Sequence, residues 1–290
     1  MSGPREADWS DLSVRFGVAT VLAVIGIFAM WLGGWFFYVM IAVICGTVTW
    51  ELARMLQHSD RMRPMDSIPT DRAPRPPKGS DAVWLGLGSG AALLLAFALP
   101  YGLALPLLLA PAMASLEVMR GARAIFVPYC VLILLAGWGL GDLRAEAGFG
   151  WMLWLALVVI ATDVFGYFAG RQFGGPKFWP RMSPKKTWSG TIAGWVAAAA
   201  VGLAWWLGTD AGIEVVGISV ALSMASQMGD IAESAVKRKM GVKDSSDLLP
   251  GHGGLFDRFD GMLGAAILLL VFRGAAEFPP AIADAAVVVL

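Results

Sequence analysis

The chain has 290 residues, of which 57% are hydrophobic and only 15% are charged. Because a soluble globular protein carries about 25% charged residues, this composition excludes an ordinary soluble domain and indicates a protein embedded in lipid. The formal net charge is zero, with 22 basic and 22 acidic residues, so the charge balance by itself indicates no partner, and no nucleic acid is expected.

Apolar segments long enough to cross a membrane begin near the N-terminus. A transmembrane helix needs about 20 apolar residues. The charge-free run at 16–50 is long enough for two crossings, which are predicted to divide at Gly33. A polar, proline-rich loop follows at 54–81, and a second charge-free run at 82–116 divides near Pro100 into two more crossings.

The second half of the chain predicts five further crossings. Their apolar segments lie at 124–141, 147–170, 189–209, 215–229 and 261–272. The predicted fold class is therefore an all-α polytopic integral membrane protein with about nine transmembrane helices. An alternative in which one hairpin is merged or dropped remains open.

The predicted organisation has two membrane regions and no soluble domain. Residues 1–123 would form an N-terminal region with helices one to four and the basic, proline-rich loop 54–81. Residues 124–290 would form a C-terminal catalytic region with helices five to nine and the loops 171–188 and 230–260.

Basic residues gather on alternate loops. With nine crossings and a cytoplasmic N-terminus, the inner segments hold 20 of the 22 Lys and Arg residues, and the outer side keeps only Arg144 and Arg273. Cytoplasmic loops of membrane proteins carry the excess of Lys and Arg. The N-terminus is therefore predicted to be cytoplasmic.

The segment at 229–261 differs from an ordinary loop between membrane helices. It contains six acids, five bases and a Gly-His-Gly-Gly turn. The spacing i, i+3, i+4, i+7 joins Asp230, Glu233, Ser234 and Lys237. If the preceding helix continues into the segment, these side chains share one helical face.

A second pair of acids leads into the last predicted helix. Asp257 and Asp260 are again three residues apart, so two acidic helix ends are predicted to converge at the inner membrane surface. Carboxylate oxygens suit Mg²⁺, which completes its shell with water and substrate phosphate. The bases would neutralise phosphates, and the glycines of the turn allow close backbone approach. A solvated loop with ordinary ion pairs is the alternative.

The stretch from Ser234 to Asp260 resembles the signature of the phosphatidate cytidylyltransferase family. Its matching positions are Ser234, Val236, Lys237, Arg238, Lys243, Asp244, Ser246, Leu249, Pro250, His252, Gly253, Gly254, Leu255, Asp257, Arg258, Phe259 and Asp260. Upstream, 161–190 is similar to a second familiar stretch of the family, with Gly-Arg followed by Ser-Pro-Lys-Lys-Thr-Trp. It departs at Ser189, where the family usually has Glu. The two stretches cover about a fifth of the chain.

The resemblance implies a reaction, a location and partners. CTP and phosphatidic acid would give CDP-diacylglycerol and pyrophosphate with Mg²⁺ as cofactor, and a second cation is left open. The resemblance also implies the bacterial cytoplasmic (inner) membrane, an active site facing the cytoplasm, membrane lipid as partner, and a homodimer.

The site residues that follow from the signature and its chemistry fall into three groups. The candidate catalytic residues are Asp257, Asp260, Lys237, Arg258 and His252. The candidate metal ligands are Asp230, Asp257 and Asp260. The candidate substrate-binding residues are Ser234, Arg238, Lys243, Asp244, Gly253, Gly254, Lys185, Lys186, Thr187, Asp163 and Arg171. Because phosphatidate attacks as an anion and needs no general base, a hydrogen bond or a turn is the alternative role of His252.

Asp163 is an isolated acid inside the sixth predicted crossing. It lies eight residues before Arg171, so roughly 12 Å below the inner surface at about 1.5 Å per residue. Acids at such depth usually face a cavity or pathway, which favours a site role over a structural ion pair. Two roles are equally open for Lys185, Lys186 and Thr187. They could contact substrate phosphate, or they could anchor the inner loop at the membrane surface.

Two further features have structural interpretations. Glu51 and Arg54 are three residues apart at the inner end of the second crossing, which predicts an ion pair. Cys45 and Cys130 lie inside apolar runs without metal-ligand spacing, which predicts buried free thiols.

Rival functions come from two classes. The nearer rival is an enzyme that uses another lipid phosphate, or a CTP-dependent polyprenol kinase. The other rival is a transporter or lipid flippase, which would place polar or broken helices near the midplane. The ionisable residues of this chain cluster instead at one predicted surface, with Asp163 the main exception.

Overall fold

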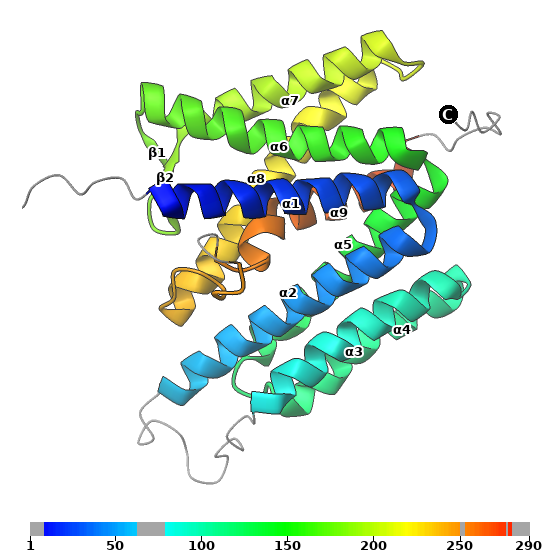
Figure 1. Cartoon of the computed structure of the whole chain (residues 1–290), viewed down its shortest axis with the longest axis vertical. Coiled ribbons are helices and arrows are strands. Elements are labelled where there is room, and N and C mark those ends of the chain that lie inside the picture. Colours follow the sequence, from blue (N-terminus) through cyan, green and yellow to red (C-terminus); the bar gives the residue numbers. More distant parts are fainter. Residues whose placement is uncertain (1–8, 63–78, 250–252, 277, 280–290) are drawn as a thin grey trace, which may run out of the picture.

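The computed structural model describes residues 9–62, 79–249, 253–276 and 278–279. These residues form nine helices and one small antiparallel hairpin (Figure 1). The helices are α1 (Trp9–Leu32), α2 (Gly34–Met62), α3 (Gly79–Ala98), α4 (Tyr101–Val118), α5 (Arg123–Glu146), α6 (Gly148–Phe173), α7 (Trp188–Gly208), α8 (Glu214–Met240) and α9 (Phe256–Ala276). The strands are β1 (Lys177–Trp179) and β2 (Ser183–Thr187), paired between α6 and α7.

The predicted all-α polytopic class is confirmed. In the described part of the chain, eight helices are long and apolar enough to cross a membrane, and α1 contributes a shorter apolar stretch, Thr20–Leu32. The first two helices divide at Gly33, and Pro100 precedes α4, both as predicted. The hairpin was not predicted, because its strands have only three and five residues.

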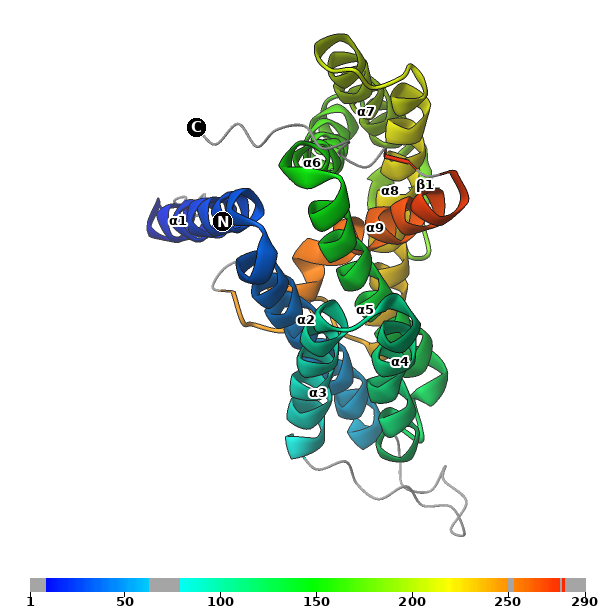
Figure 2. The same cartoon turned by 90° about the vertical axis from the view of Figure 1, so that its right-hand side faces the viewer.

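The described helices form two groups that meet at α5. The helices α2, α3 and α4 pack together on one side, and α6 to α9 pack together on the other (Figure 2). The central helix α5 contacts members of both groups, including α2, α4, α6 and α9. The predicted boundary between residues 123 and 124 falls at the start of this shared helix.

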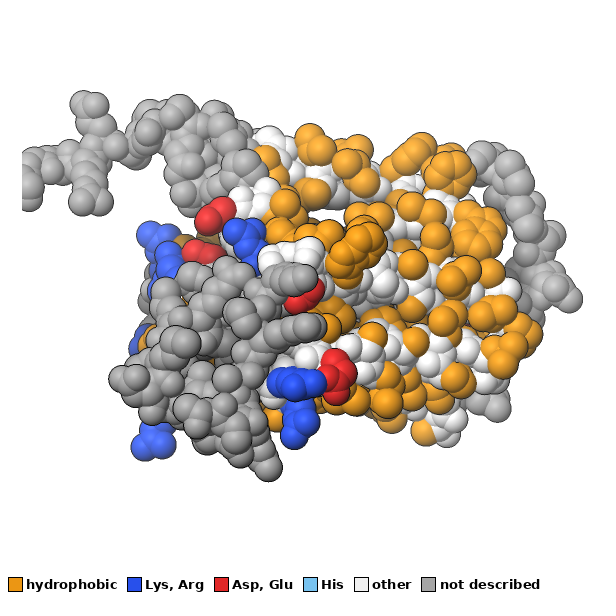
Figure 3. Space-filling view, turned by 90° about the horizontal axis from the view of Figure 1, so that it is seen from below, with side chains coloured by type: hydrophobic (Ala, Val, Ile, Leu, Met, Phe, Trp, Pro, Cys, Tyr) orange, Lys and Arg blue, Asp and Glu red, His pale blue; other side chains and the backbone are white. Residues whose placement is uncertain are grey.

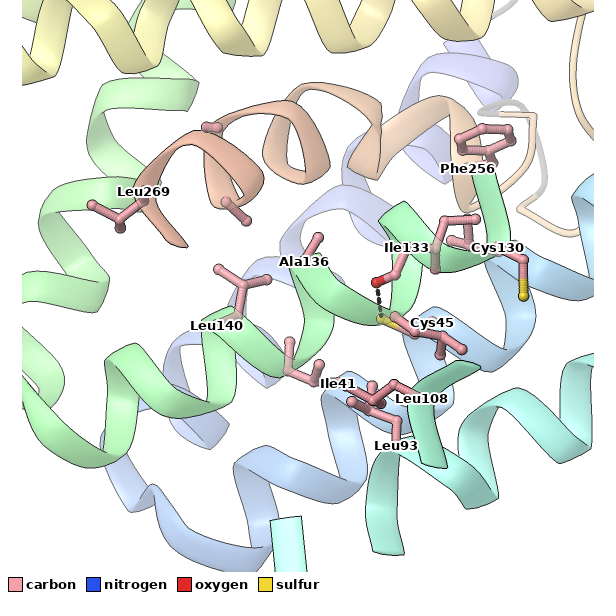
Figure 4. Close-up of a cluster of buried hydrophobic side chains, with 14 of the residues drawn as sticks. Ile41, Cys45, Leu93, Leu108, Cys130, Ile133, Ala136, Leu140, Phe256 and Leu269 are labelled. Atoms are coloured by element: carbon pink, nitrogen blue, oxygen red, sulfur yellow. Dashed lines mark hydrogen bonds between the residues drawn. The ribbon is translucent and has the colours of Figure 1, made fainter. Parts of the chain in front are cut away.

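Aliphatic and aromatic side chains and two cysteines fill the interface around α5. Cys45 of α2, Leu93 of α3 and Leu269 of α9 all lie in this buried cluster (Figure 4). The Cys45 thiol donates to the carbonyl oxygen of Ile133 on α5, with 3.6 Å between sulfur and oxygen. Both cysteines are free and buried, so that prediction is confirmed. Because lipid is as apolar as these side chains, close packing rather than exclusion from water holds such helices together.

The surface separates apolar from charged side chains. Large apolar residues face outward along the helices, with Phe36 68% and Trp84 70% exposed. Contiguous apolar surface of this kind is rare on soluble monomers, and it suits contact with lipid chains. Charged side chains gather at one end in the view from below (Figure 3). This end carries the β1–β2 hairpin and the start of α1 (Figure 1).

Candidate active site

Three carboxylates converge at the charged end, between α8 and α9. Oxygens of Asp230 and Glu233 on α8 and of Asp260 on α9 all lie within 4.8 Å of one another. We call these three residues the carboxylate group. Because α8 runs on to Met240, it places Asp230 and Glu233 on one helical face, as their spacing predicts.

Glycines bring the two helices close enough for the carboxylate group to form. A Cβ atom added at Gly229 of α8 would lie 2.3 Å from the carbonyl oxygen of Asp260. A Cβ added at Gly264 of α9 would lie 2.3 Å from the carbonyl oxygen of Ala225. No side chain fits at either position without a shift of the neighbouring backbone. Glycine at these two positions therefore allows the short distance between α8 and α9.

Two lysines contact the carboxylate group. Lys186, from β2, forms an ion pair with Asp230. The Nζ atom of Lys237 lies 2.6 Å from Oε2 of Glu233. Asp163 of α6 is within electrostatic range of both Asp230 and Lys186, which places this predicted site residue beside the group.

Glu233 is the most enclosed member of the carboxylate group. Its side chain is 1% exposed, and its Oε1 atom has no hydrogen-bond partner among the described residues. A buried, unpaired carboxylate oxygen is costly, and a divalent cation is a partner that hard oxygen donors prefer. The prediction had noted Glu233 on the acidic face without counting it as a ligand.

Asp257 performs a different task from the carboxylate group. Its Oδ1 atom lies 2.6 Å from Nζ of Lys237. Its Oδ2 atom accepts hydrogen bonds from the backbone N–H groups of Ser245 at 2.9 Å and Gly254 at 2.8 Å. Asp257 therefore fixes both the lysine and the loop that joins α8 to α9, which we call the signature loop (residues 241–255). Its predicted role as a metal ligand stays a prediction.

Glu51 of α2 anchors the signature loop from the other helix group. This carboxylate is 0% exposed. It accepts hydrogen bonds from the backbone N–H groups of Leu255 at 2.9 Å and Phe256 at 2.6 Å, and from the hydroxyl of Ser246 at 2.5 Å. An acid at this position satisfies N–H groups that the start of α9 leaves without intrahelical partners.

The predicted ion pair between Glu51 and Arg54 is wrong. The Arg54 guanidinium lies over the Trp50 ring, 5.4 Å from its centroid, while Glu51 faces the signature loop. The sequence reasoning missed Glu51 because its partners are about 200 positions away. The one local sign of this role in the sequence is that Glu51 is an acid at the end of a predicted membrane crossing.

Glycines of the signature loop are required by crowding around the two anchoring acids. A Cβ added at Gly254 would lie 2.0 Å from Oγ of Ser245 and 2.6 Å from Oε1 of Glu51. Gly253 has a φ of +78°, and its carbonyl accepts from the N–H of Leu249 at 2.9 Å. The predicted contacts of these glycines with phosphate remain predictions. His252 lies outside the described residues.

The β1–β2 hairpin presents one lysine inward and one outward. Lys186 is half-buried against Asp230, whereas Lys185 is exposed. Thr187 is buried and caps α7, since its hydroxyl accepts from the N–H of Gly190 at 3.3 Å. Ser189, the departure from the family pattern, donates to the carbonyl of Gly174 at 2.5 Å. Thr187 therefore has a structural task besides its predicted contact with substrate.

The remaining predicted residues surround this centre. Ser234 lies beside Asp230, 3.5 Å from its Oδ1 atom. The other five are exposed at the charged end: Arg171, Arg238, Lys243, Asp244 and Arg258. The structure thus joins Asp163, Lys186, Asp230, Lys237 and Asp260 in one place and leaves the three predicted arginines exposed.

A protein-family model matches the chain over most of its length. A model of the cytidylyltransferase family matches residues 13–275. The chain is 51% identical over 134 residues to the phosphatidate cytidylyltransferase of Brucella abortus (biovar 1, strain 9-941), a match that covers 45% of this chain and 50% of that protein.

Relatives from other bacteria are more distant. The phosphatidate cytidylyltransferase of Staphylococcus aureus (strain COL) is 41% identical over 131 residues, covering 44% of this chain and 50% of that protein. That of Mycobacterium tuberculosis (strain ATCC 25618 / H37Rv) is 38% identical over 153 residues, covering 50% of this chain and 43% of that protein. The chain thus spans about half the length of the curated relatives it matches. The match of the family model over residues 13–275 shows that the chain belongs to the cytidylyltransferase family.

Proposed function

We propose that the chain transfers the cytidylyl group of CTP to phosphatidate, giving CDP-diacylglycerol and pyrophosphate. The observation that carries this proposal is the carboxylate group, whose oxygens lie within 4.8 Å of one another beside two lysines at the charged end of a membrane-spanning bundle. The names of the relatives, each a phosphatidate cytidylyltransferase, support the choice of substrates.

The chemistry demands positioning more than covalent catalysis. An oxygen of the phosphatidate phosphate attacks the α-phosphorus of CTP, and the bond from that phosphorus to the oxygen bridging to the β-phosphorus breaks. Pyrophosphate carries away the electron pair. Because the attacking phosphate is already an anion, the protein has to align two anions and stabilise the charge of the leaving group.

We propose that Asp230, Glu233 and Asp260 hold Mg²⁺. Their oxygens form the hard donor set that Mg²⁺ prefers, and Oε1 of Glu233 has no hydrogen-bond partner among the described residues. Bound Mg²⁺ would screen the phosphates and polarise the phosphorus–oxygen bonds. Asp163, within electrostatic range of Asp230, is our candidate for a second cation.

Lys237 is our candidate for neutralising the reacting phosphates. It is held between Glu233 and Asp257, with 2.6 Å to each, so its ammonium group is fixed next to the carboxylate group. Asp257 acts as its positioning residue. The exposed Arg238, Lys243 and Arg258 would draw the anionic nucleotide to this end of the molecule through the summed charge.

We place the reaction at the inner face of the bacterial cytoplasmic membrane. CTP is in the cytoplasm, and the predicted excess of Lys and Arg on this side supports a cytoplasmic site. Phosphatidate would enter sideways from the inner leaflet. The homodimer that the family resemblance implies stays a prediction.

The proposal is tested by transfer of radiolabel from CTP into the lipid phase, using purified protein in detergent with phosphatidate and Mg²⁺. Asp260→Asn is expected to lower turnover by about 100-fold or more. The substitution removes one negatively charged ligand of the proposed Mg²⁺, which weakens stabilisation of the transition state. Asp210→Asn, in the exposed connection between α7 and α8, is the matched control and should keep full turnover.

Several outcomes would contradict the proposal. A fully active Asp260→Asn protein, or turnover that survives EDTA, would overturn the metal assignment. Folded wild-type protein that transfers no label to phosphatidate would overturn the substrate. Polyprenol and other lipid phosphates would then be offered as acceptors, and failure with all of them would favour transport.

A further inference from the structure

A cavity borders the signature loop. It has a volume of about 800 Å³ and is lined by residues of α2, the start of α3, Val242 and residues 244–248. This volume is within the usual range of ligand pockets, about 300–1,000 Å³. Asp244 and Asp247 make the cavity wall polar where the signature loop forms it. Trp50 of α2 and Val83 of α3 form part of the wall on the helices.

An apolar groove continues from this cavity along the membrane-facing surface. The groove has a volume of about 470 Å³, lies between α2 and α3, and shares Trp50 and Val83 with the cavity. It extends to Val39 and Leu94. Trp50 and Val39 are eleven positions apart in α2, which is about 16 Å of helix at about 1.5 Å per residue. The hydrocarbon core is about 30 Å thick, so the groove is as long as one leaflet.

The polar end offers both signs of charge. Arg54 is exposed, lies over the Trp50 ring and takes part in no ion pair among the described residues. Gln57 is only 5% exposed, and its amide nitrogen contacts Met119 Sδ at 3.9 Å, which is a weak acceptor. This buried amide therefore retains donor capacity toward the cavity. Asp244 and Asp247 supply two exposed carboxylates opposite.

We propose that this cavity and groove bind one inner-leaflet aminophospholipid, whose headgroup carries a phosphate and an ammonium group. One acyl chain lies in the groove, Arg54 and Gln57 bind the phosphate, and Asp247 with Asp244 accepts from the ammonium. Among the described residues that line the cavity, a lipid that carries only negative charge would face two carboxylates and one guanidinium, so their charge complementarity favours the zwitterion.

The bound lipid would contact the signature loop, which is hydrogen-bonded to Asp257 next to the carboxylate group. Ser245 and Ser246 belong to the cavity wall, and their hydroxyls also contact Glu51 and Asp257. A ligand that binds the folded state alone stabilises it by mass action. The aminophospholipid is therefore expected to raise the unfolding temperature of the detergent-purified chain.

The test compares lipid retention by native mass spectrometry on the full, delipidated chain. Dioleoyl phosphatidylethanolamine and dioleoyl phosphatidylglycerol have identical tails and differ in the headgroup. Wild-type protein is expected to retain the first at concentrations about tenfold lower, a difference of about 1.4 kcal/mol. Asp247→Asn should remove most of this preference, and Arg54→Gln should weaken retention of both lipids.

Two further variants separate the groove from the headgroup site. Val43→Trp, at an exposed position that lines the groove, is expected to fill it and weaken retention of both lipids. Asp210→Asn should change nothing. Thermal unfolding of each variant checks that it is folded.

The proposal has clear contrary results. Equal retention of both lipids by the wild type would overturn the aminophospholipid assignment. Unchanged retention by a folded Val43→Trp protein would overturn the groove. Both measurements are independent of CTP turnover, so they stand apart from the proposed reaction.

Discussion

Glu51 shows how one side chain connects distant parts of this molecule. Its two oxygens receive hydrogen bonds from Phe256, the first residue of α9, and from the signature loop, although Glu51 itself lies on α2. The same loop is bonded to Asp257, which holds Lys237. A change at Glu51 would therefore reach the reaction centre through the loop without touching any reacting atom.

We predict that Glu51→Gln lowers both thermal stability and turnover. Hydrogen bonds to a charged group contribute about 1.5–3 kcal/mol each, and Gln offers one acceptor oxygen in place of two. Glu51→Ala should be more harmful still. Thermal unfolding in detergent and the label-transfer assay measure the two effects. Glu117→Gln, an exposed acid on α4, serves as the control.

The prediction for Glu51 can fail in a clear way. A Glu51→Gln protein with the unfolding temperature and kcat of the Glu117→Gln control would show that the anchoring contacts carry little energy. A loss of kcat larger than any change in KM would support positioning of Lys237 and Asp257 over substrate binding.

At the scale of elements, the contact between α8 and α9 decides where the carboxylate group can form. Each helix contributes acids that would repel one another, and the close approach at Gly229 and Gly264 brings them together nonetheless. A small-residue contact of this kind allows tight helix packing in membranes. The distance between the helices is therefore part of the proposed metal site.

We predict that Gly264→Ala weakens Mg²⁺-dependent turnover and lowers stability by about 1–3 kcal/mol, because overpacking pushes the helices apart. Gly274→Ala is the matched control, since a Cβ at this position of the same helix meets nothing within 4 Å. The control should be neutral or slightly more stable, as Ala is the better helix former. Mg²⁺ titration of turnover measures the difference.

The outcome for the two glycine variants decides between geometry and general stability. If Gly264→Ala needs no more Mg²⁺ than Gly274→Ala, the α8–α9 distance does not set metal affinity. If it needs more Mg²⁺ while remaining folded, the packing contact controls the proposed site.

At the scale of the whole molecule, both arginines expected on the outer side have internal partners. Arg144 donates to the carbonyl oxygen of Met30 at 2.5 Å, near the end of α1. Arg273 forms an ion pair with Asp142 at 2.7 Å. These contacts explain how the end away from the carboxylate group accommodates its few bases.

We predict that the hairpin is cytoplasmic and that the α7–α8 connection faces the outside. Arg181→Cys and Asp210→Cys place single reactive thiols on these two exposed sites. A membrane-impermeant maleimide should label Asp210→Cys in intact spheroplasts and Arg181→Cys only after the membrane is opened. The native cysteines are buried and should react little. The reverse pattern would show the opposite orientation.

Features that depend on local spacing follow from the amino-acid sequence alone. Runs of apolar residues predict the helices, because each membrane helix satisfies its own backbone hydrogen bonds. Asp230 and Lys237 could be assigned to one face, because the helical repeat places residues seven apart on the same side. The family signature likewise depends on the order of residues alone.

Only the tertiary structure decided which distant groups meet. In the folded chain Lys186 forms an ion pair with Asp230, and Glu233 is the most enclosed member of the carboxylate group. Glu51 contacts the signature loop, far along the chain, and does not pair with its neighbour Arg54. The groove between α2 and α3 also arises from packing. These features depend on how helices approach one another in space, and helical periodicity specifies the face of a helix without specifying the neighbour that covers it.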